Sequence, residues 1–394
     1  MGKLLKIRSL VSLCKFFYLP KPTNLDKNMG ATMLIEKKNI NLIISQGENM
    51  IKTFTVEGRQ GTSAIHVGES LSRVEDYLPD QGSVVIVTDE NILKHYGASF
   101  PAGHVITIGT GEKIKTLATV EYILREMIKA GCDRSSFLLA IGGGIVCDIA
   151  GFAASVFLRG IRFGFVSTSL LSQVDASVGG KNGVNLDAFK NMVGVFNQPL
   201  FVLCDIDMLS TLPDREICNG LAEIVKHGLI KDHDLLAFIE NNRDKALDLD
   251  RKTVFRMVAD SVAIKSRVVQ ADEREAGERR KLNFGHTIGH AFEKLNPCGH
   301  GRAVAAGMVA AAQFSQQKGY INQGDVDRIK ALLSGLGLPV AFDVPPEQII
   351  EAASRDKKKQ GNNLFFVFLG QIGQARVEEI SYDDLNGFIR GYFV

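Results

Sequence analysis

Apolar residues recur at regular spacings through the first half of the chain, and these spacings predict both strands and helices. Short β-branched runs at 83–89 and 104–112 end in turns, as strands do. Between 116 and 131 the apolar residues recur at helical spacing, and Gly131 follows them as a left-handed cap. The run at 135–144 is apolar throughout, which is typical of a strand covered on both faces. Strands that alternate with helices predict a parallel, doubly wound α/β sheet.

The pattern changes near residue 211, where TLPDRE interrupts it and longer amphipathic stretches begin. These helical stretches span 217–230, 253–269, 285–295 and 303–319. The second half therefore looks all-helical, and a last apolar run at 363–370 fits either a strand or a buried terminal segment. We expect an N-terminal extension at 1–50, an α/β domain at 51–210 and a mainly α-helical domain at 211–394, since single cores rarely exceed about 250 residues.

The composition is that of an ordinary soluble globular protein, with 23% charged and 45% apolar residues. A net charge of +2 argues against a nucleic-acid-binding surface but allows a small anionic substrate. The six cysteines are scattered and form no C-x-x-C pair, so we expect reduced thiols in a cytoplasmic protein. No run of about 18 apolar residues is present, so we expect no membrane span.

Residues 1–30 are basic and apolar, and their basic residues interrupt every apolar run before it reaches signal-peptide length. We therefore do not expect secretion. Three interpretations remain open: a disordered cationic arm, a weak organellar presequence, or a stretch upstream of a true start at Met29 or Met33. The first is the interpretation that we favour.

Two glycine-rich turns follow predicted strands of the sheet. A triple glycine at 142–144 precedes a helical stretch that contains Asp148, and GTGEKIKT at 109–116 contributes Glu112 and Lys115. Glycines allow the backbone to approach a pyrophosphate, whose charge the amides of the next helix can stabilise. A triple glycine alone fits an ordinary tight turn equally well. Two such turns at the carboxyl ends of strands in one sheet favour a nucleotide-binding crevice.

The segment at 166–198 is too polar for a core and too rich in Asn, Gly and Lys for a plain helix. We interpret it as a functional loop, and a solvated surface loop is the alternative. Lysine supplies a mobile charge and asparagine supplies directional donors, which together suit phosphate and carboxylate groups. The candidate residues for this cradle are Asp175, Lys181, Asn182, Lys190 and Asn191.

Three histidines lie close together in the sequence and suggest a metal site. On a helix, His286 and His290 project from one face about 5–6 Å apart, and His300 could return a third nitrogen to the same place. Glu223, within an otherwise apolar helix, offers an oxygen ligand. Two histidines and one glutamate leave coordination positions open, as a catalytic zinc requires. The alternative is that the histidines are ordinary polar residues, and we expect Cys298 to be a bystander.

Several long motifs carry a resemblance to the 3-dehydroquinate synthase family of NAD- and metal-dependent sugar phosphate cyclases. These motifs are GGGIVCDIAGFAA, LLSQVDASVGGKNGVN, KNMVG, TLPDRE, GLAEIVKHGLI, LNFGHTIGHAFE and DKK. The resemblance extends from about residue 51 to 390. It implies a Rossmann-like NAD-binding domain, an all-α metal-binding domain, an active site between them, and a homodimer.

The resemblance also implies a role for individual residues. Ligands of a zinc or cobalt ion fall on Glu223, His286 and His300. Substrate-pocket positions fall on Arg159, Asp175, Lys181, Asn191, Lys226, Lys265, Arg279, Asn283 and His290, with Lys357 or Lys358 completing the set. Cofactor positions fall on Glu112, Lys115, Gly143, Gly144, Asp148, Thr168, Ser169 and Lys190, and Lys181 borders both sets.

Four residues depart from the family's usual pattern. Arg302 replaces a glutamate, Cys147 a glycine, Asn182 a threonine and Phe189 a glycine. Loss of an acceptor close to a metal ligand can change metal affinity or activity about 10- to 100-fold. The departures leave open a sister cyclase of the 2-epi-5-epi-valiolone or 2-deoxy-scyllo-inosose synthase type. A metal-dependent alcohol or glycerol dehydrogenase and a non-catalytic relative also remain open.

The activity that the resemblance implies belongs to the shikimate pathway. 3-Deoxy-D-arabino-heptulosonate 7-phosphate would be converted to 3-dehydroquinate and phosphate. The implied steps are transient oxidation by NAD, β-elimination of phosphate, re-reduction and intramolecular aldol closure. We expect an anionic sugar phosphate as the ligand, with neither nucleic acid nor membrane as a partner.

Overall fold

The computed structural model describes residues 43–46, 49–59, 61–187, 189–296, 298–354 and 362–392. The chain separates into two units, 1–33 and 34–394, and the first lies wholly outside the described residues. Most of the expected N-terminal extension therefore lies outside them as well. Lys357 and Lys358 are also outside the described residues.

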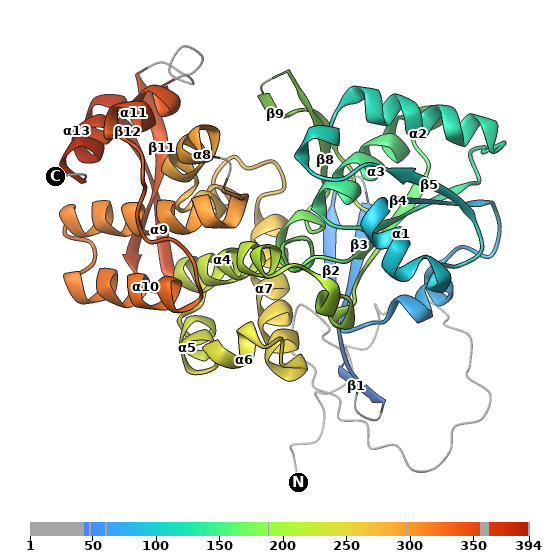
Figure 1. Ribbon diagram of the computed structural model, residues 1–394, viewed down its shortest axis with the longest axis horizontal. Helices are drawn as coiled ribbons and strands as arrows, with labels where there is room; N and C mark the ends of the chain where they lie inside the picture. Colours follow the sequence, from blue (N-terminus) through green and yellow to red (C-terminus); the bar gives the residue numbers. More distant parts are fainter. Residues whose placement is uncertain are drawn as a thin grey trace, which may run out of the picture. The chain divides into compact units, whose positions relative to one another are not determined.

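An eight-stranded sheet forms the centre of the first half, with strand order β1-β2-β3-β10-β7-β6-β4-β5 (Figure 1). The strands are β1 (Ile43–Gln46), β2 (Asn49–Gly58), β3 (Gly61–Val67), β4 (Val84–Asp89), β5 (His104–Ile108), β6 (Phe137–Gly142), β7 (Arg162–Ser167) and β10 (Phe201–Cys204). The six strands from β3 to β5 pair in parallel, which confirms the predicted parallel sheet. Strands β1 and β2 add an antiparallel edge and begin before residue 51, where we expected regular structure to start.

Helices α1 (Glu90–Tyr96), α2 (Leu117–Lys129) and α3 (Gly144–Val156) connect the parallel strands. In α2 the buried residues Val120, Ile123 and Met127 form one face, as the helical spacing predicts. Thr116 caps the start of α2 by accepting a hydrogen bond from the Thr119 amide at 3.3 Å. Gly131 follows its end with φ +72°. Strand β6 is buried at all six positions, which agrees with its unbroken apolar sequence.

The polar segment at 166–198 forms regular structure instead of the loop that we expected. It contains a π-helical turn (Ser172–Ala176) and an antiparallel hairpin of β8 (Lys181–Leu186) and β9 (Phe189–Phe196). Gly183 pairs with Gly194 in this hairpin, and a Cβ on Gly183 would lie 2.6 Å from the Val193 carbonyl oxygen. The glycines that suggested a loop therefore allow two backbones to approach closely.

The second half is helical, with one antiparallel hairpin added to it. Its helices are α4 (Asp214–Lys231), α5 (His233–Asn241), α6 (Arg243–Leu247), α7 (Arg251–Ala271), α8 (His286–Leu295), α9 (His300–Gln317), α10 (Gln323–Gly335), α11 (Pro346–Ser354) and α13 (Tyr382–Tyr392). The apolar run at 363–370 is a strand, β11 (Asn363–Gln371), which pairs with β12 (Gln374–Ser381). Phe366 and Phe368 pack on Phe314 of α9, with ring centroids 5.4 and 5.1 Å away. In the described ranges, no helix combines the length and apolar character that crossing a bilayer requires.

Helices α4, α8 and α9 cross at close range because glycines lie at their contacts. A Cβ on Gly307 of α9 would clash with the carbonyl oxygen of Gly285 and lie 2.9 Å from the amide nitrogen of Gly289 in α8. A Cβ on Gly301 would clash with the backbone of Asn219 in α4. These crossings fix how the first residues of α8 and α9 are placed relative to α4.

We expect Gly307→Ala to lower the free energy of unfolding by about 1–3 kcal/mol, because the added methyl group must push α8 and α9 apart. Alanine would otherwise favour a helix interior by about 1 kcal/mol. Gly387→Ala in α13 is the matched control, since a Cβ there meets no atom within 4 Å. Urea titrations followed by circular dichroism would measure both changes. Equal stability changes in the two variants would contradict the close crossing.

Candidate active site

Glu223 of α4 lies at the centre of the predicted metal cluster and is fully buried. Its Oε1 atom is 3.7 Å from His286 Nε2 and 3.6 Å from His300 Nε2. Its Oε2 atom forms an ion pair with Lys226, one turn further along α4. Within the described residues neither carboxylate oxygen has a well-formed hydrogen bond. The structure therefore brings the three predicted ligand atoms together around one buried negative charge.

The donor atoms of this cluster suit a cation, which would replace a proton on His300: burial lowers the pKa of His300, but the carboxylates of Glu223 and Glu293 outweigh burial and raise that pKa to about 9. Burial alone would raise the pKa of Glu223, but the ammonium of Lys226 and the two histidine rings hold that pKa well below its usual value. Burial, reinforced by Lys226, lowers the pKa of His286 well below its usual value. His286 Nδ1 lies 3.2 Å from the carbonyl oxygen of Phe284, so a proton there leaves the Nε2 lone pair directed at the site. A buried carboxylate and two imidazoles fit zinc or cobalt.

His290 lies beside these candidate ligands, but it differs from them because it is not paired with Glu223. Its ring centroid is 5.0 Å from that of His286 and 5.7 Å from that of His300. The three histidines can bring one nitrogen each within 4.8 Å of one another. His290 is exposed, however, and among the described residues Glu223 pairs with His286 and His300 but not with His290.

A second group of charges joins the two halves of the molecule. Lys265 of α7 forms an ion pair with Asp175 Oδ1 at 2.6 Å, in the π-helical turn that follows β7. Burial lowers the pKa of Lys265 to about 8. Burial would raise the pKa of Asp175, but Lys265 outweighs it, and this pKa is lowered. Lys226 is buried nearby and influences both groups, so the metal cluster borders a cationic region.

Glu275 is a residue of this region that the sequence reasoning missed. Its carboxylate forms an ion pair with Lys181 of β8 and accepts a hydrogen bond from Asn283 Nδ2 at 2.5 Å. Its backbone has φ +63°, which is unusual for a residue other than glycine. Arg279 is buried close by and donates to the carbonyl oxygens of Glu273 (2.7 Å) and Gly179. In the sequence, Glu275 is hidden among the alternating charges of DEREAGERR.

The structure does not bring every predicted pocket residue to this region. Arg159 is exposed after α3 with φ +71°, and within the described residues no ion pair or hydrogen bond joins it to the others. Asn191 accepts a hydrogen bond from Lys115 Nζ at 2.6 Å. Asn191 therefore lies beside a predicted cofactor residue and not beside Lys181.

Predicted cofactor residues gather at the carboxyl ends of β5, β6 and β7. Gly143 caps α3 without any side-chain hydrogen bond, so the first amides of α3 are open to an anion. A Cβ on Gly143 would lie 3.2 Å from Ser169 Oγ, and the Thr168 amide donates to the Gly142 carbonyl at 3.0 Å. Lys115 forms an ion pair with Asp148 at 2.5 Å. Glycine backbone and an uncapped helix start fit the pyrophosphate of NAD.

The remaining two cofactor positions have other partners. Glu112 accepts a hydrogen bond from Asn185 of β8 at 2.7 Å. Lys190 of β9 forms an ion pair with Glu293 of α8 at 2.9 Å. The hairpin β8–β9 therefore contacts the glycine-turn region on one side and the metal-ligand helix on the other.

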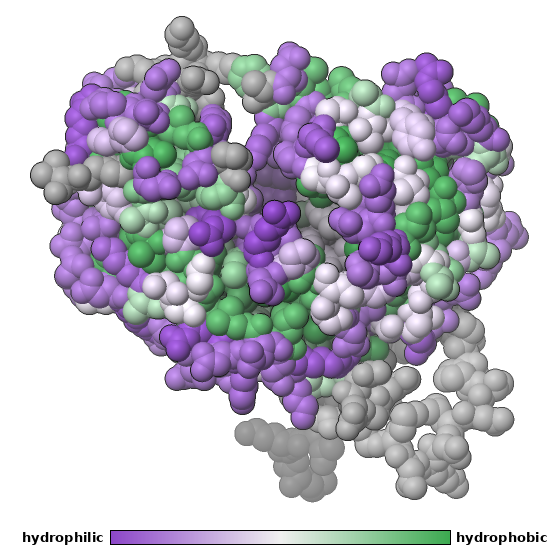
Figure 2. Space-filling model, viewed as in Figure 1, coloured by the Kyte–Doolittle hydropathy of each residue, from purple (hydrophilic) through white to green (hydrophobic). Residues whose placement is uncertain are grey.

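Figure 2 shows a hollow with a hydrophilic wall in the visible face, between α8 and the hairpin β8–β9 of Figure 1.

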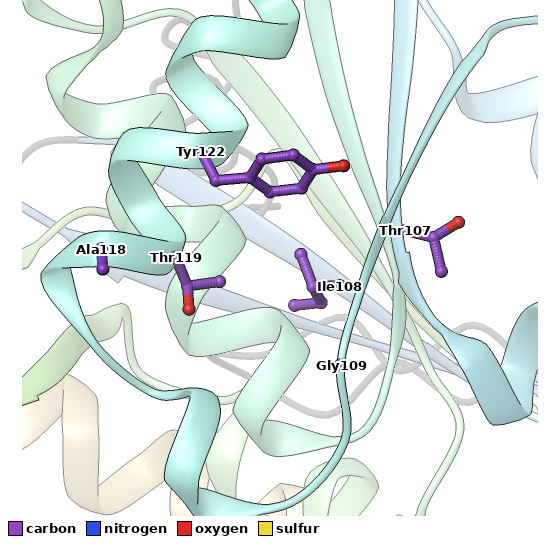
Figure 3. Close-up of a pocket in the computed structure, with 6 residues that line it drawn as sticks. All are labelled: Thr107, Ile108, Gly109, Ala118, Thr119 and Tyr122. Carbon is purple, nitrogen blue, oxygen red and sulfur yellow. The ribbon is translucent and has the colours of Figure 1, made fainter.

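A separate pocket of about 280 Å³ lies between the end of β5 and the start of α2 (Figure 3). Its lining residues are Thr107, Ile108, Gly109, Ala118, Thr119 and Tyr122. None of them belongs to the predicted site, so this pocket borders the glycine turn without containing the charged residues.

The fold and the site together define a class: an α/β dinucleotide-type domain followed by a helical domain in which histidine and glutamate side chains converge as candidate metal ligands. The family models described as 3-dehydroquinate synthase N-terminal and C-terminal match residues 105–219 and 220–359. A 3-dehydroquinate synthase of Citrifermentans bemidjiense is 47% identical over 280 residues, which are 70% of this chain and 77% of the relative. One of Nitrosospira multiformis is 42% identical over 329 residues, 79% of this chain and 90% of the relative.

A solved structure agrees with these matches. A 2-deoxy-scyllo-inosose synthase complexed with carbaglucose-6-phosphate, NAD+ and Co2+ is 28% identical, with a TM-score of 0.77 over 86% of this chain and 99% of that chain. The chain belongs to the 3-dehydroquinate synthase family.

We expect Lys265→Met to lower the free energy of unfolding at pH 7 by roughly 3 kcal/mol, because Asp175 would lose its cation in a partly buried place. The folded-state pKa of Asp175 is lowered. The pair's contribution is therefore present above the usual carboxyl pKa and is lost as the pH falls through the folded value.

Urea titrations of both proteins at pH 7 and at pH 3, which lies below the usual carboxyl pKa, would measure this difference, which should shrink at pH 3. Lys129→Met, which removes an exposed ion pair with Glu126, is the control and should change stability by less than about 0.5 kcal/mol. A loss from Lys265→Met that is the same at both pH values would contradict the assigned pair.

Proposed function

We propose that this chain converts 3-deoxy-D-arabino-heptulosonate 7-phosphate to 3-dehydroquinate and phosphate. The convergence of Glu223, His286 and His300 beside a region of buried cations carries the proposal. This arrangement suits a substrate that is an anion at both ends and a polyol between them. Membership in the 3-dehydroquinate synthase family supports the same activity.

The two halves of the chain would bind different groups. We assign residues 51–210 to the cofactor half and 211–394 to the metal- and substrate-binding half. Glu223, His286 and His300 would hold zinc or cobalt, which supplies Lewis acidity and lowers the pKa of a hydroxyl bound to it. The amides at Gly143 and Gly144, with Asp148 and Lys115, would hold NAD, which supplies a reversible hydride acceptor.

The protein's own cations would bind and orient the substrate. Lys181, Arg279 and Asn283 lie together around Glu275 and would hold an anionic group of the substrate. Glu275 already contacts Lys181 and Asn283, so an incoming anion must share these donors with it or displace it. Lys181 and Asn283 would then donate hydrogen bonds to the substrate instead of to Glu275.

Lys226 and Lys265 would act on the central part of the substrate. Both ammonium groups are buried, so they stabilise negative charge more strongly than exposed lysines do. The pKa of Lys265, lowered to about 8 by burial, allows its Nζ atom to hold or release a proton near neutral pH. Asp175 fixes this ammonium group in place at 2.6 Å.

The oligomeric state and the cellular location complete the proposal. We infer a homodimer and a cytoplasmic location, in keeping with a biosynthetic enzyme that acts on a charged sugar phosphate. Sedimentation velocity on the purified full chain would test the dimer. A monomer at micromolar concentration would exclude it without affecting the proposed reaction.

One assay tests the proposed reaction. Purified protein is incubated with the heptulosonate phosphate, NAD and zinc or cobalt, and the products are identified by mass. We expect phosphate and 3-dehydroquinate in equal amounts, with no net absorbance at 340 nm. NADH accumulation with a simple alcohol would indicate a dehydrogenase instead. Turnover of a different sugar phosphate alone would indicate a sister cyclase.

We expect Glu223→Gln to reduce kcat/KM by at least about 10²- to 10³-fold, because the neutral amide cannot balance a divalent cation in a buried site. Initial rates of phosphate release with saturating metal would measure the change. Glu121→Gln on the exposed face of α2 is the control and should retain wild-type rates. Wild-type activity in Glu223→Gln would refute the central place given to this carboxylate.

A further inference from the structure

Glu293 is a mostly buried carboxylate beside the metal cluster that the proposed reaction leaves without a role. It lies on α8, seven residues after His286 and three after His290, so all three side chains project from one face of the helix. Its side chain is only 12% exposed. A carboxylate in such a position needs partners that balance its charge.

Each oxygen of Glu293 has a different cationic partner. Oε2 lies 3.7 Å from His300 Nδ1, and Oε1 accepts from Lys190 Nζ at 2.9 Å. Glu293 is therefore shared between His300, at the start of α9, and the hairpin β8–β9.

The two histidine ligands are oriented in different ways. His286 has a backbone carbonyl, that of Phe284, at its Nδ1. His300 has the Glu293 carboxylate at its Nδ1, while its Nε2 faces Glu223. A carboxylate at the far nitrogen fixes the ring and its tautomer and makes the ligating nitrogen more basic. Of the two Nδ1 atoms, only that of His300 contacts a charged side chain, and Lys190 contacts the same side chain.

We propose that Glu293 is a positioning residue that orients His300 for the metal, and that Lys190 tunes this action by competing for the same carboxylate. The proposal rests on the metal site of the proposed function but not on the substrate. When Lys190 is drawn to an anion, such as a phosphate of the cofactor, Glu293 would be left to His300 alone. The anion and the metal would then favour each other's binding.

Cobalt binding to the purified full chain, without NAD or substrate, tests the orienting role. We expect Glu293→Gln to weaken Co2+ binding about 10- to 100-fold in competition with a chromophoric chelator. We also expect it to alter the visible absorption bands of the bound Co2+, which report ligand geometry. Glu240→Gln on α5 is the matched control, because it disrupts a partly buried ion pair with Arg328 of α10 and should leave both readouts unchanged.

Lys190→Gln tests the competition. It removes the competing cation and keeps the contact between Glu293 and His300, so Co2+ affinity should exceed that of the wild type. In the Glu293→Gln background the same substitution should have no further effect. Unchanged or weaker Co2+ binding by Lys190→Gln alone would overturn the tuning part of the proposal.

Wild-type Co2+ affinity and spectrum in a folded Glu293→Gln protein would overturn the orienting role. If that variant does not fold, Glu293→Asp decides the question, because it keeps the charge but withdraws the carboxylate. Unchanged affinity in Glu293→Asp would then overturn the proposal, and weaker affinity would support it. Because no substrate is used, a failed cyclase assay with intact Co2+ results would reject the proposed function and leave this inference standing.

Discussion

The buried charge of Glu223 is the constraint on which the rest of the site depends. A fully buried carboxylate is costly unless cations surround it. Here Lys226 supplies one cation from the same helix, and His286 and His300 approach from two others. The helices must therefore cross closely enough for three side chains to share one point. Glycines at 285, 301 and 307 allow that approach.

The charged residues beyond this centre link the two halves of the molecule. Lys265 of α7 contacts Asp175 after β7, and Arg279 contacts the carbonyl oxygen of Gly179. Lys190 of the hairpin contacts Glu293 of α8. Each of these pairs joins a residue of the α/β half to one of the helical half. Any ligand that binds these cations therefore acts on both halves at once.

The departures from the family pattern are accommodated locally. Arg302 donates to the carbonyl oxygen of Gly337 at 3.2 Å, and it is Glu293 that lies at His300 Nδ1. Cys147 is buried in α3 with its Sγ 3.7 Å from the Gly142 carbonyl oxygen. Asn182 is buried and donates to the carbonyl oxygen of Asn197 at 2.8 Å. None of these contacts displaces a residue of the metal cluster.

The sequence by itself determined the parallel sheet, the helices and the identity of the metal-ligand candidates. Apolar spacing and the turns are local properties, so they predicted α2, β6 and α8 directly. The sequence could not show that 166–198 folds into a π-helical turn and a hairpin, because its polar residues find their partners only after tertiary packing brings distant segments together. Nor could it show that Glu275 and Glu293 lie against candidate site residues. Their charges look like solvated surface until tertiary packing places Lys181 and Asn283 beside one, and His300 and Lys190 beside the other.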